Sequence, residues 1–491
     1  MTVENKLKIS SILRKSSKIS IANVLGYLLS VPVQIYVARA LGPANYGIVG
    51  YIAVWQTYCA LTKPGFVSAL SREIPHYLGN KDFERLGLVQ RVAISSEISY
   101  TLVPFAVLIG AAILHDSSDV AFGFILTAFT LLFNTCVDTL TTLHWSNQRF
   151  RAITINKYIQ SFLYPLLTFV FVHVFELRGV FLANLCFSVL SSIQLFILTP
   201  KLHYSFGIER GTLRYLLKLG VMLQLGSFLY AFYATLDRTI VASVFGMTAL
   251  GLYTFVYNVR FKAFGIITDF GNVLRPVFWS EMGAAGDTKG LNAHVFKISL
   301  ILVAAAGVLA NCAQAGFGFV VDAFLPKYLD AVPVLELAMF TLSLGAASLM
   351  FENVLLSKMV NKVIVSSLTW LVGIVVAGGI AYALLYLYPD NILLVPMAFI
   401  CGGAIVFMTN MLVAWRYVFD SPRQFIRYVL LVAGLLILQA VVYLLLRQID
   451  LFATSWSNLA LKIGLVTLVW GSLAVVGYRL APFLKRLLYA A

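Results

Sequence analysis

Long apolar runs, separated by short segments with charged residues, glycine or proline, make up almost the whole chain. A helix that crosses a bilayer needs about 20 mostly apolar residues. Fourteen runs reach roughly that length, at residues 18–41, 46–70, 92–114, 119–143, 152–175, 179–199, 216–245, 250–276, 294–322, 331–356, 362–387, 391–416, 426–446 and 457–480. We therefore expect an all-α polytopic membrane protein with about 14 transmembrane helices.

One short motif lies where the first two runs meet. Residues 37–47 read VARALGPANYG, and a looser copy at residues 241–251 reads VASVFGMTALG. Gly42 can take the positive φ of a helix C-terminus, and Pro43 suits the first turn of the next helix. The recurrence predicts two related bundles in one chain, as in transporters built from repeats. Chance is the alternative, because glycine-containing turns are common in a chain with 34 glycines.

A polar connection at residues 201–214 precedes the second copy of the motif. We predict that it separates two six-helix bundles, at residues 1–205 and 206–420. The last two runs have no counterpart in that scheme. Residues 421–491 are therefore expected to form an appended pair of helices, numbers 13 and 14.

Composition agrees with a membrane protein. Hydrophobic residues make up 60% of the chain, charged residues only 12%, and the mean hydropathy is +0.88. Soluble domains have roughly 45–50% apolar and 25% charged residues. The basic N-terminus precedes an apolar run longer than the roughly 7–15 residues of a signal peptide, so we expect a retained first helix. The five cysteines are scattered singly, without metal or redox spacing.

The number of basic residues differs between successive connections. One set of alternate connections is rich in lysine and arginine, whereas the other offers only Arg39, Arg178, Arg238, Lys327 and Arg447. Because cytoplasmic connections carry the excess of basic residues, we expect both termini in the cytoplasm and an even number of spans. Orientation signals thus explain most of the formal charge of +15, and no nucleic acid partner is expected.

Ionisable residues inside the runs are candidates for function, because a charge at the centre of a spanning helix costs about 2.5–3.5 kcal/mol. The alternative is a side chain near a helix end that reaches the membrane interface without a function. For Glu97, Lys157, Glu336 and Glu352, which lie near the ends of their runs, the two interpretations have equal weight. Deeper candidates are Lys63, Asp138, Asp237, Arg238, Arg260, Lys262 and Asp269. We expect Asp237 and Arg238 to pair with other helices in a structural role.

The sharpest cluster lies in the run at 250–276. Lys262 and Asp269 are seven residues apart and share a helix face, whereas Arg260 points nearly opposite to Lys262. Either Arg260 lines a water-filled cavity while Lys262 pairs with Asp269 or with a neighbouring helix, or the two roles are reversed. We favour Arg260, which would have Tyr253 and Tyr257 near its face.

Motifs of enzymes and nucleotide-driven pumps are absent from the sequence. There is no G-x-x-x-x-G-K-[ST] pattern, no H-E-x-x-H pattern, and no large loop with paired carboxylates. We therefore expect a transporter rather than an enzyme, with no ATP hydrolysis in this chain, no bound metal and no cofactor.

The chain resembles the multidrug/oligosaccharidyl-lipid/polysaccharide (MOP) exporter superfamily, specifically its polysaccharide transporter branch with the Wzx-type flippases. The resemblance is carried by RALGPANYG at 39–47, by DRTIVASVFG at 237–246 with ALGLY at 249–253, and by the following Arg275-Pro276. It implies a V-shaped pair of six-helix bundles around a cavity that opens alternately to the two sides, without nucleotide hydrolysis.

The resemblance also implies a cargo and a setting. The cargo would be an undecaprenyl-diphosphate-linked oligosaccharide for O-antigen, lipopolysaccharide or another surface polysaccharide, and the location the bacterial inner membrane. A polysaccharide polymerase and a chain-length regulator would be partners, besides the membrane lipids. A cation-coupled multidrug antiporter, a lipid II flippase and a membrane enzyme that joins or modifies such lipids stay as alternatives.

A diphosphate stripped of water needs charge-assisted hydrogen bonds from lysine or arginine. Given that cargo, we expect Arg260 with Lys63 or Arg39 to engage the diphosphate. Asp269 or Asp138 would couple transport to a proton or to a cation such as sodium. The full set predicted for diphosphate and sugar in the cavity is Arg260, Lys63, Arg39, Lys262, Tyr253 and Tyr257.

Overall fold

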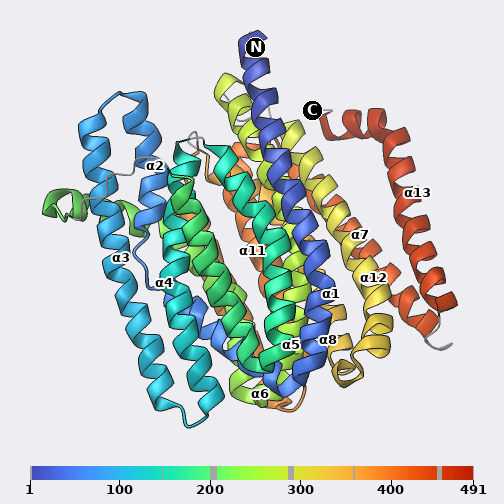
Figure 1. The fold of residues 1–491 in the computed structure, drawn as a ribbon. Coiled ribbons are helices and arrows are strands. Elements are labelled where there is room, and N and C mark those ends of the chain that lie inside the picture. Colours follow the sequence, from blue (N-terminus) through green and yellow to red (C-terminus); the bar gives the residue numbers. More distant parts are fainter. Residues whose placement is uncertain are drawn as a thin grey trace. The chain divides into compact units, whose positions relative to one another are not determined.

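The computed structural model describes residues 3–147, 149–199, 207–285, 292–357, 360–450 and 456–489. All the regular elements among these residues are helices, shown in Figure 1. They are α1 Val3–Leu61, α2 Phe66–Gly79, α3 Phe83–Leu114, α4 Ser118–Ser146, α5 Phe150–Ile197, α6 Arg210–Ala285, α7 Asn292–Phe324, the short 3₁₀ helix η2 Pro326–Tyr328, α8 Ala331–Ala338, α9 Phe340–Leu355, α10 Val363–Leu387, α11 Leu394–Val418, α12 Pro422–Asp450 and α13 Trp456–Tyr489.

Eleven helical segments in the described part of the chain are long and apolar enough to cross a membrane. The predicted class, an all-helical multi-pass membrane protein, is therefore confirmed. Three of these segments contain a residue with non-helical backbone angles: Gly42 in α1 (φ 69°, ψ 171°), Glu176 in α5 (φ 48°, ψ −121°) and Gly246 in α6 (φ 79°, ψ −174°). Both copies of the sequence motif thus place a glycine at a positive φ, which residues with a Cβ rarely adopt.

The described chain divides into two compact units, Met1–Gly251 and Leu252–Ala491. The predicted boundary between residues 205 and 206 lies outside the described residues, so the division into two six-helix bundles and a helix pair stays a prediction. All five cysteines are free thiols, and Cys59 is buried.

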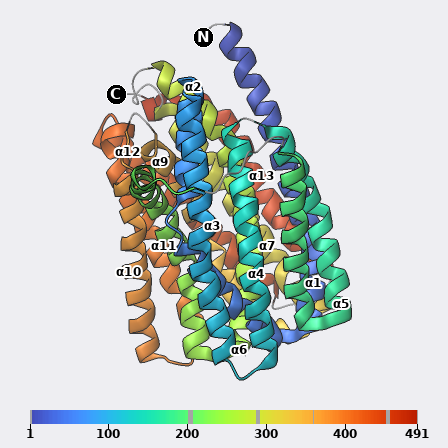
Figure 2. The ribbon, with the colours of Figure 1, turned by 60° about the vertical axis from the view of Figure 1, so that its left-hand side comes forward.

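In the first unit α2, α3 and α4 pack against one another, and α5 packs against α1 and α4. Figures 1 and 2 both show α3 and α4 side by side. Buried apolar side chains from α2 through the start of α6 form a core, including Phe66 and Ile74 of α2, Val92 of α3 and Leu216 of α6. This core includes residues along the whole length of α2 and so holds that helix in place.

The two copies of the motif contact each other in this unit. A Cβ added at Gly47 would overlap the backbone carbonyl of Met247, and a Cβ added at Gly251 would overlap the backbone carbonyl of Pro43. The contact is reciprocal, because Pro43 and Met247 occupy the same position in their copies of the motif, four residues before Gly47 and Gly251. Glycine is required at both positions for the backbones to approach this closely.

A second reciprocal glycine contact lies further along the same helices. A Cβ on Gly65 would be 2.6 Å from the carbonyl oxygen of Gly220, and a Cβ on Gly220 would be 2.7 Å from that of Gly65. The hydroxyl groups of Tyr58 and Thr239 are 2.6 Å apart between the two glycine contacts. The seam between α1 and α2 on one side and α6 on the other is therefore closed at both ends.

The second unit contains a buried polar network that joins α7, α8, α9, α12 and α13. The Trp470 indole donates to Asn311 Oδ1 (3.0 Å), and the Asn311 amide donates to the carbonyl of Gln439 (3.2 Å). Gln314 donates to the carbonyl of Glu336 (2.7 Å), and Ser343 donates to Gln439 Oε1 (2.7 Å). Further hydrogen-bonded pairs in the network are Asn311 with Gln314 and Tyr443 with Glu336.

Replacing Trp470 with phenylalanine is expected to destabilise the second unit by about 1–3 kcal/mol, because Asn311 Oδ1 loses its donor while buried. Thermal unfolding of the purified protein in detergent measures the effect. Trp456, which is 74% exposed, provides the matched control for the same substitution. An equal fall in Tm for Trp456→Phe would contradict a structural role of this hydrogen bond.

Candidate functional site

Lys63 lies in a break between two helices. Helix α1 ends at Leu61, α2 begins at Phe66, and Gly65 has φ 82° and ψ 30°. Pro64 lacks a backbone N–H and cannot continue the hydrogen-bond ladder of α1. The break lies inside the apolar run predicted at 46–70, and interrupted spanning helices are typical of transporter binding sites because they expose backbone groups at membrane depth.

Neighbouring helices hold the ammonium group of Lys63. Its Nζ donates to Thr135 Oγ1 of α4 at 2.6 Å and lies 3.7 Å from Glu97 Oε1 of α3. The side chains of Lys63 and Glu97 are 13% and 4% exposed. Thr101 Oγ1 donates to the Glu97 carbonyl at 2.7 Å and contacts Thr135 Oγ1 at 3.3 Å. These contacts connect the helix break to α3 and α4 through one polar cluster.

Asp138 lies one turn of α4 beyond Thr135, and its side chain is exposed. It is close enough to Lys63 and Lys157 for electrostatic interaction with both ammonium groups. Lys157 itself donates to Gln160 at 3.1 Å. Glu97 therefore provides a counter-charge for Lys63 without a ligand. An incoming phosphate, or protonation of a carboxylate, would change which group Lys63 binds.

Arg260 and Tyr257 lie together on α6, in the second unit. The Arg260 guanidinium carbon is 5.4 Å from the centroid of the Tyr257 ring, which is cation–π geometry. Tyr253 is buried, at 2% exposed, while Lys262 and Asp269 are half-buried. The contact between Arg260 and Tyr257 agrees with the predicted i−3 spacing, and the lining of a cavity by Arg260 stays a prediction.

The remaining predicted residues differ in their exposure to solvent. Arg39 is exposed, three residues before the non-helical Gly42. Asp237 and Arg238 are 0% and 4% exposed, and a guanidinium nitrogen of Arg238 lies 3.4 Å from Thr235 Oγ1. Their burial agrees with the structural role expected for them.

Sequence reasoning missed two features of this site. It gave Glu97 equal odds of lying merely at the interface, whereas the structure buries Glu97 against Lys63. It also treated residues 46–70 as one continuous span. The dipeptide Pro64-Gly65 is a turn signal that could have indicated the break.

A protein-family model matches a large part of the chain. The model for the family described as "Polysaccharide biosynthesis protein" matches residues 12–282, more than half of the chain. The match includes the helix break and both copies of the motif. No curated protein matches the sequence.

Solved structures with the same fold come from MOP transporters. The lipid II flippase MurJ in an inward closed conformation has a TM-score of 0.71 at 13% identity, covering 94% of this chain and 98% of MurJ. An inward-facing multidrug resistance MATE family transporter of the MOP superfamily has a TM-score of 0.64 at 13% identity, covering 85% of this chain and 98% of the transporter. A MOP superfamily transporter from Pyrococcus furiosus has a TM-score of 0.60 at 13% identity, with coverage of 86% and 96%.

At 13% identity the solved structures establish only the fold of this chain, whereas the family model establishes that the chain belongs to the family. Together they confirm the predicted resemblance. The chain belongs to the polysaccharide biosynthesis protein family, and it has the fold of the MOP superfamily of transporters.

Proposed function

We propose that this protein is a flippase that moves an undecaprenyl-diphosphate-linked oligosaccharide across the bacterial inner membrane by alternating access, for O-antigen or another surface polysaccharide. The observation that carries the proposal is Lys63, a basic side chain in the break between α1 and α2, inside an apolar run of a polysaccharide biosynthesis family member. The cargo requires such a group, because its diphosphate must leave water while its polyprenyl tail stays in lipid.

In this mechanism the diphosphate competes with Glu97 for Lys63. The pair is 3.7 Å apart, while Thr135 at 2.6 Å provides the shorter contact, so an anion could replace Glu97 while Lys63 stays bound to Thr135. Arg260 would engage the diphosphate, together with Lys63 or Arg39. Asp138 or Asp269 would couple transport to a proton or sodium ion. Lys262, Tyr253 and Tyr257 complete the proposed cargo site.

The proposed topology has fourteen spans and both termini in the cytoplasm. The interruptions at Gly42, Glu176 and Gly246 would divide three of the eleven apolar helical segments and give that number. Helices 1–6 and 7–12 would form two bundles, with helices 13 and 14 appended. A polysaccharide polymerase and a chain-length regulator would act on the cargo next.

The proposal predicts what accumulates when the gene is deleted. Spheroplasts of the deletion strain should hold undecaprenyl-diphosphate-linked repeat units on the cytoplasmic face of the membrane, and the intact gene should remove them. Accumulation of lipid II on that face would indicate a lipid II flippase instead. Unchanged lipid-linked sugars together with greater sensitivity to organic cations would favour a multidrug antiporter.

Arg260→Ala tests the proposed contact between Arg260 and the diphosphate. Removal of the guanidinium should slow flipping of the lipid-linked oligosaccharide in proteoliposomes by roughly 10- to 100-fold, the equivalent of one lost charge-assisted hydrogen bond. Arg85, whose side chain is 71% exposed, gives a matched control in Arg85→Ala. A normal rate for Arg260→Ala would remove Arg260 from the cargo site.

A further inference from the structure

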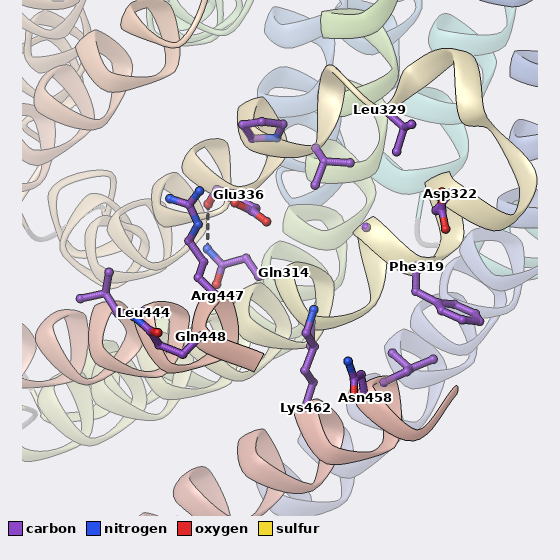
Figure 3. Close-up of a pocket in the computed structure, with 15 residues that line it drawn as sticks. Gln314, Phe319, Asp322, Leu329, Glu336, Leu444, Arg447, Gln448, Asn458 and Lys462 are labelled. Carbon is purple, nitrogen blue, oxygen red and sulfur yellow. Dashed lines mark hydrogen bonds between the residues drawn. The ribbon is translucent and has the colours of Figure 1, made fainter. Parts of the chain in front are cut away.

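A cavity of about 640 Å³ lies within the second unit, apart from the residues proposed for the cargo. Its walls are the C-terminal parts of α7 and α12, the start of α8 and the first turns of α13. Figure 3 shows Lys462 pointing into the cavity, with Arg447 and Glu336 on one side and Asp322 on the other.

The acidic and basic side chains that line this cavity come from different helices. The acidic side chains come from α7 and α8, as Asp322 and Glu336, and the basic ones come from α12 and α13, as Arg447 and Lys462. Lys462 is only 6% exposed, although it lies in a segment apolar enough to cross a membrane. Charges at such a position are costly and mark functional sites.

Hydrogen bonds between the helices fix the positions of the residues that line the cavity. Gln314 lines the cavity and donates to the backbone carbonyl of Glu336 at 2.7 Å. Tyr443 donates to Glu336 Oε2 at 3.0 Å, one turn of α12 before Arg447. The geometry of the acidic and basic walls is therefore set before any ligand arrives, which lowers the cost of binding.

The lining selects a ligand that carries both signs of charge. Asp322 and Glu336 would repel a purely anionic group, and Arg447 and Lys462 would repel a purely cationic group. The rim is apolar, since Leu444 is 58% exposed and Leu329 is 46% exposed. A headgroup in the cavity would thus have its acyl chains against exposed leucines.

We propose that this cavity binds the headgroup of a zwitterionic phospholipid with a primary amine, such as phosphatidylethanolamine. Lys462 and Arg447 receive the phosphate, and Asp322 receives the ammonium. A primary ammonium donates three hydrogen bonds, which a quaternary ammonium cannot do. The site recognises a lipid of the surrounding bilayer rather than the cargo.

Native mass spectrometry of the purified full chain tests the proposal with three phospholipids of identical acyl chains, carrying ethanolamine, choline or glycerol headgroups. The ethanolamine lipid should be retained about ten-fold more than either of the others, the ratio expected from one charge-assisted bond. Equal retention of all three, or displacement of the ethanolamine lipid by a soluble oligosaccharide, would overturn the proposal.

Two variants test the roles of the walls. Asp322→Asn should lower retention of the ethanolamine lipid and raise retention of the glycerol lipid, because it removes both the ammonium partner and the repulsion of an anion. Lys462→Gln should lower retention of all three lipids. Asp330→Asn, an exposed acidic residue near the same helix ends that does not line the cavity, is the matched control and should change nothing. Parallel losses of both lipids in Asp322→Asn, or an effect of Asp330→Asn, would contradict the assignment.

Discussion

Replacing Lys63 with methionine is expected to slow flipping of the lipid-linked oligosaccharide by roughly 10- to 100-fold, because the helix break loses its charge-assisted contact with the diphosphate. The variant should also be less stable. Glu97 would remain buried without its counter-charge, which costs about 3–5 kcal/mol when one partner of a buried pair is removed. Thermal unfolding and proteoliposome flipping of the same preparation measure the two effects.

The double variant Lys63→Met with Glu97→Gln separates stability from transport. It removes the buried carboxylate along with the ammonium, so unfolding should return close to that of the unmodified protein. Flipping should stay as slow as in Lys63→Met. Recovery of flipping together with stability would show that Lys63 acts only as the structural partner of Glu97. Arg85→Met removes an exposed partner of Asp82 and should alter neither measurement.

The second large effect is expected at the glycine contact between the motif copies. Gly47→Ala places a methyl group against the Met247 carbonyl, and the backbones of α1 and α6 must move apart. Overpacking of this kind costs about 1–3 kcal/mol. Because the contact is between backbones, which cannot adopt another rotamer, we expect a fall in both Tm and flipping rate.

Gly110 supplies the control, because a Cβ at this position on α3 would have no neighbour within 4 Å. Gly110→Ala should leave stability unchanged or raise it by about 0.5–1 kcal/mol through helix propensity. If Gly47→Ala behaves like Gly110→Ala, the close approach of the two motif copies does not exist in the protein. A fall for Gly47→Ala alone supports it.

Sequence patterns predicted the helical membrane class well, because apolar runs of this length have almost no other stable arrangement. They also identified the motif whose copies meet at Gly47 and Gly251. The contact itself could not be predicted, since periodicity within one helix does not say which other helix lies against it.

The site was predicted only in part, because sequence does not show whether a charged side chain near a helix end is buried in the protein or lies at the membrane interface. Lys63 stood out as a charge within an apolar run, but the pairing with Glu97 depends on how α3 and α4 pack around the break. Glu97 lies near the start of its run, where an interfacial side chain and a buried partner look alike in sequence. The polar network around Asn311 escaped notice because amides carry no charge and do not interrupt an apolar pattern.

Flippase activity can be measured with the unmodified protein in sealed proteoliposomes that contain a defined undecaprenyl-diphosphate-linked oligosaccharide. We expect the sugar to become accessible on the opposite face at a rate above that of protein-free vesicles, without ATP, and we expect Lys63→Met with Glu97→Gln to reduce this gain by roughly 10- to 100-fold. Movement of an organic cation with no movement of the lipid-linked sugar would contradict it.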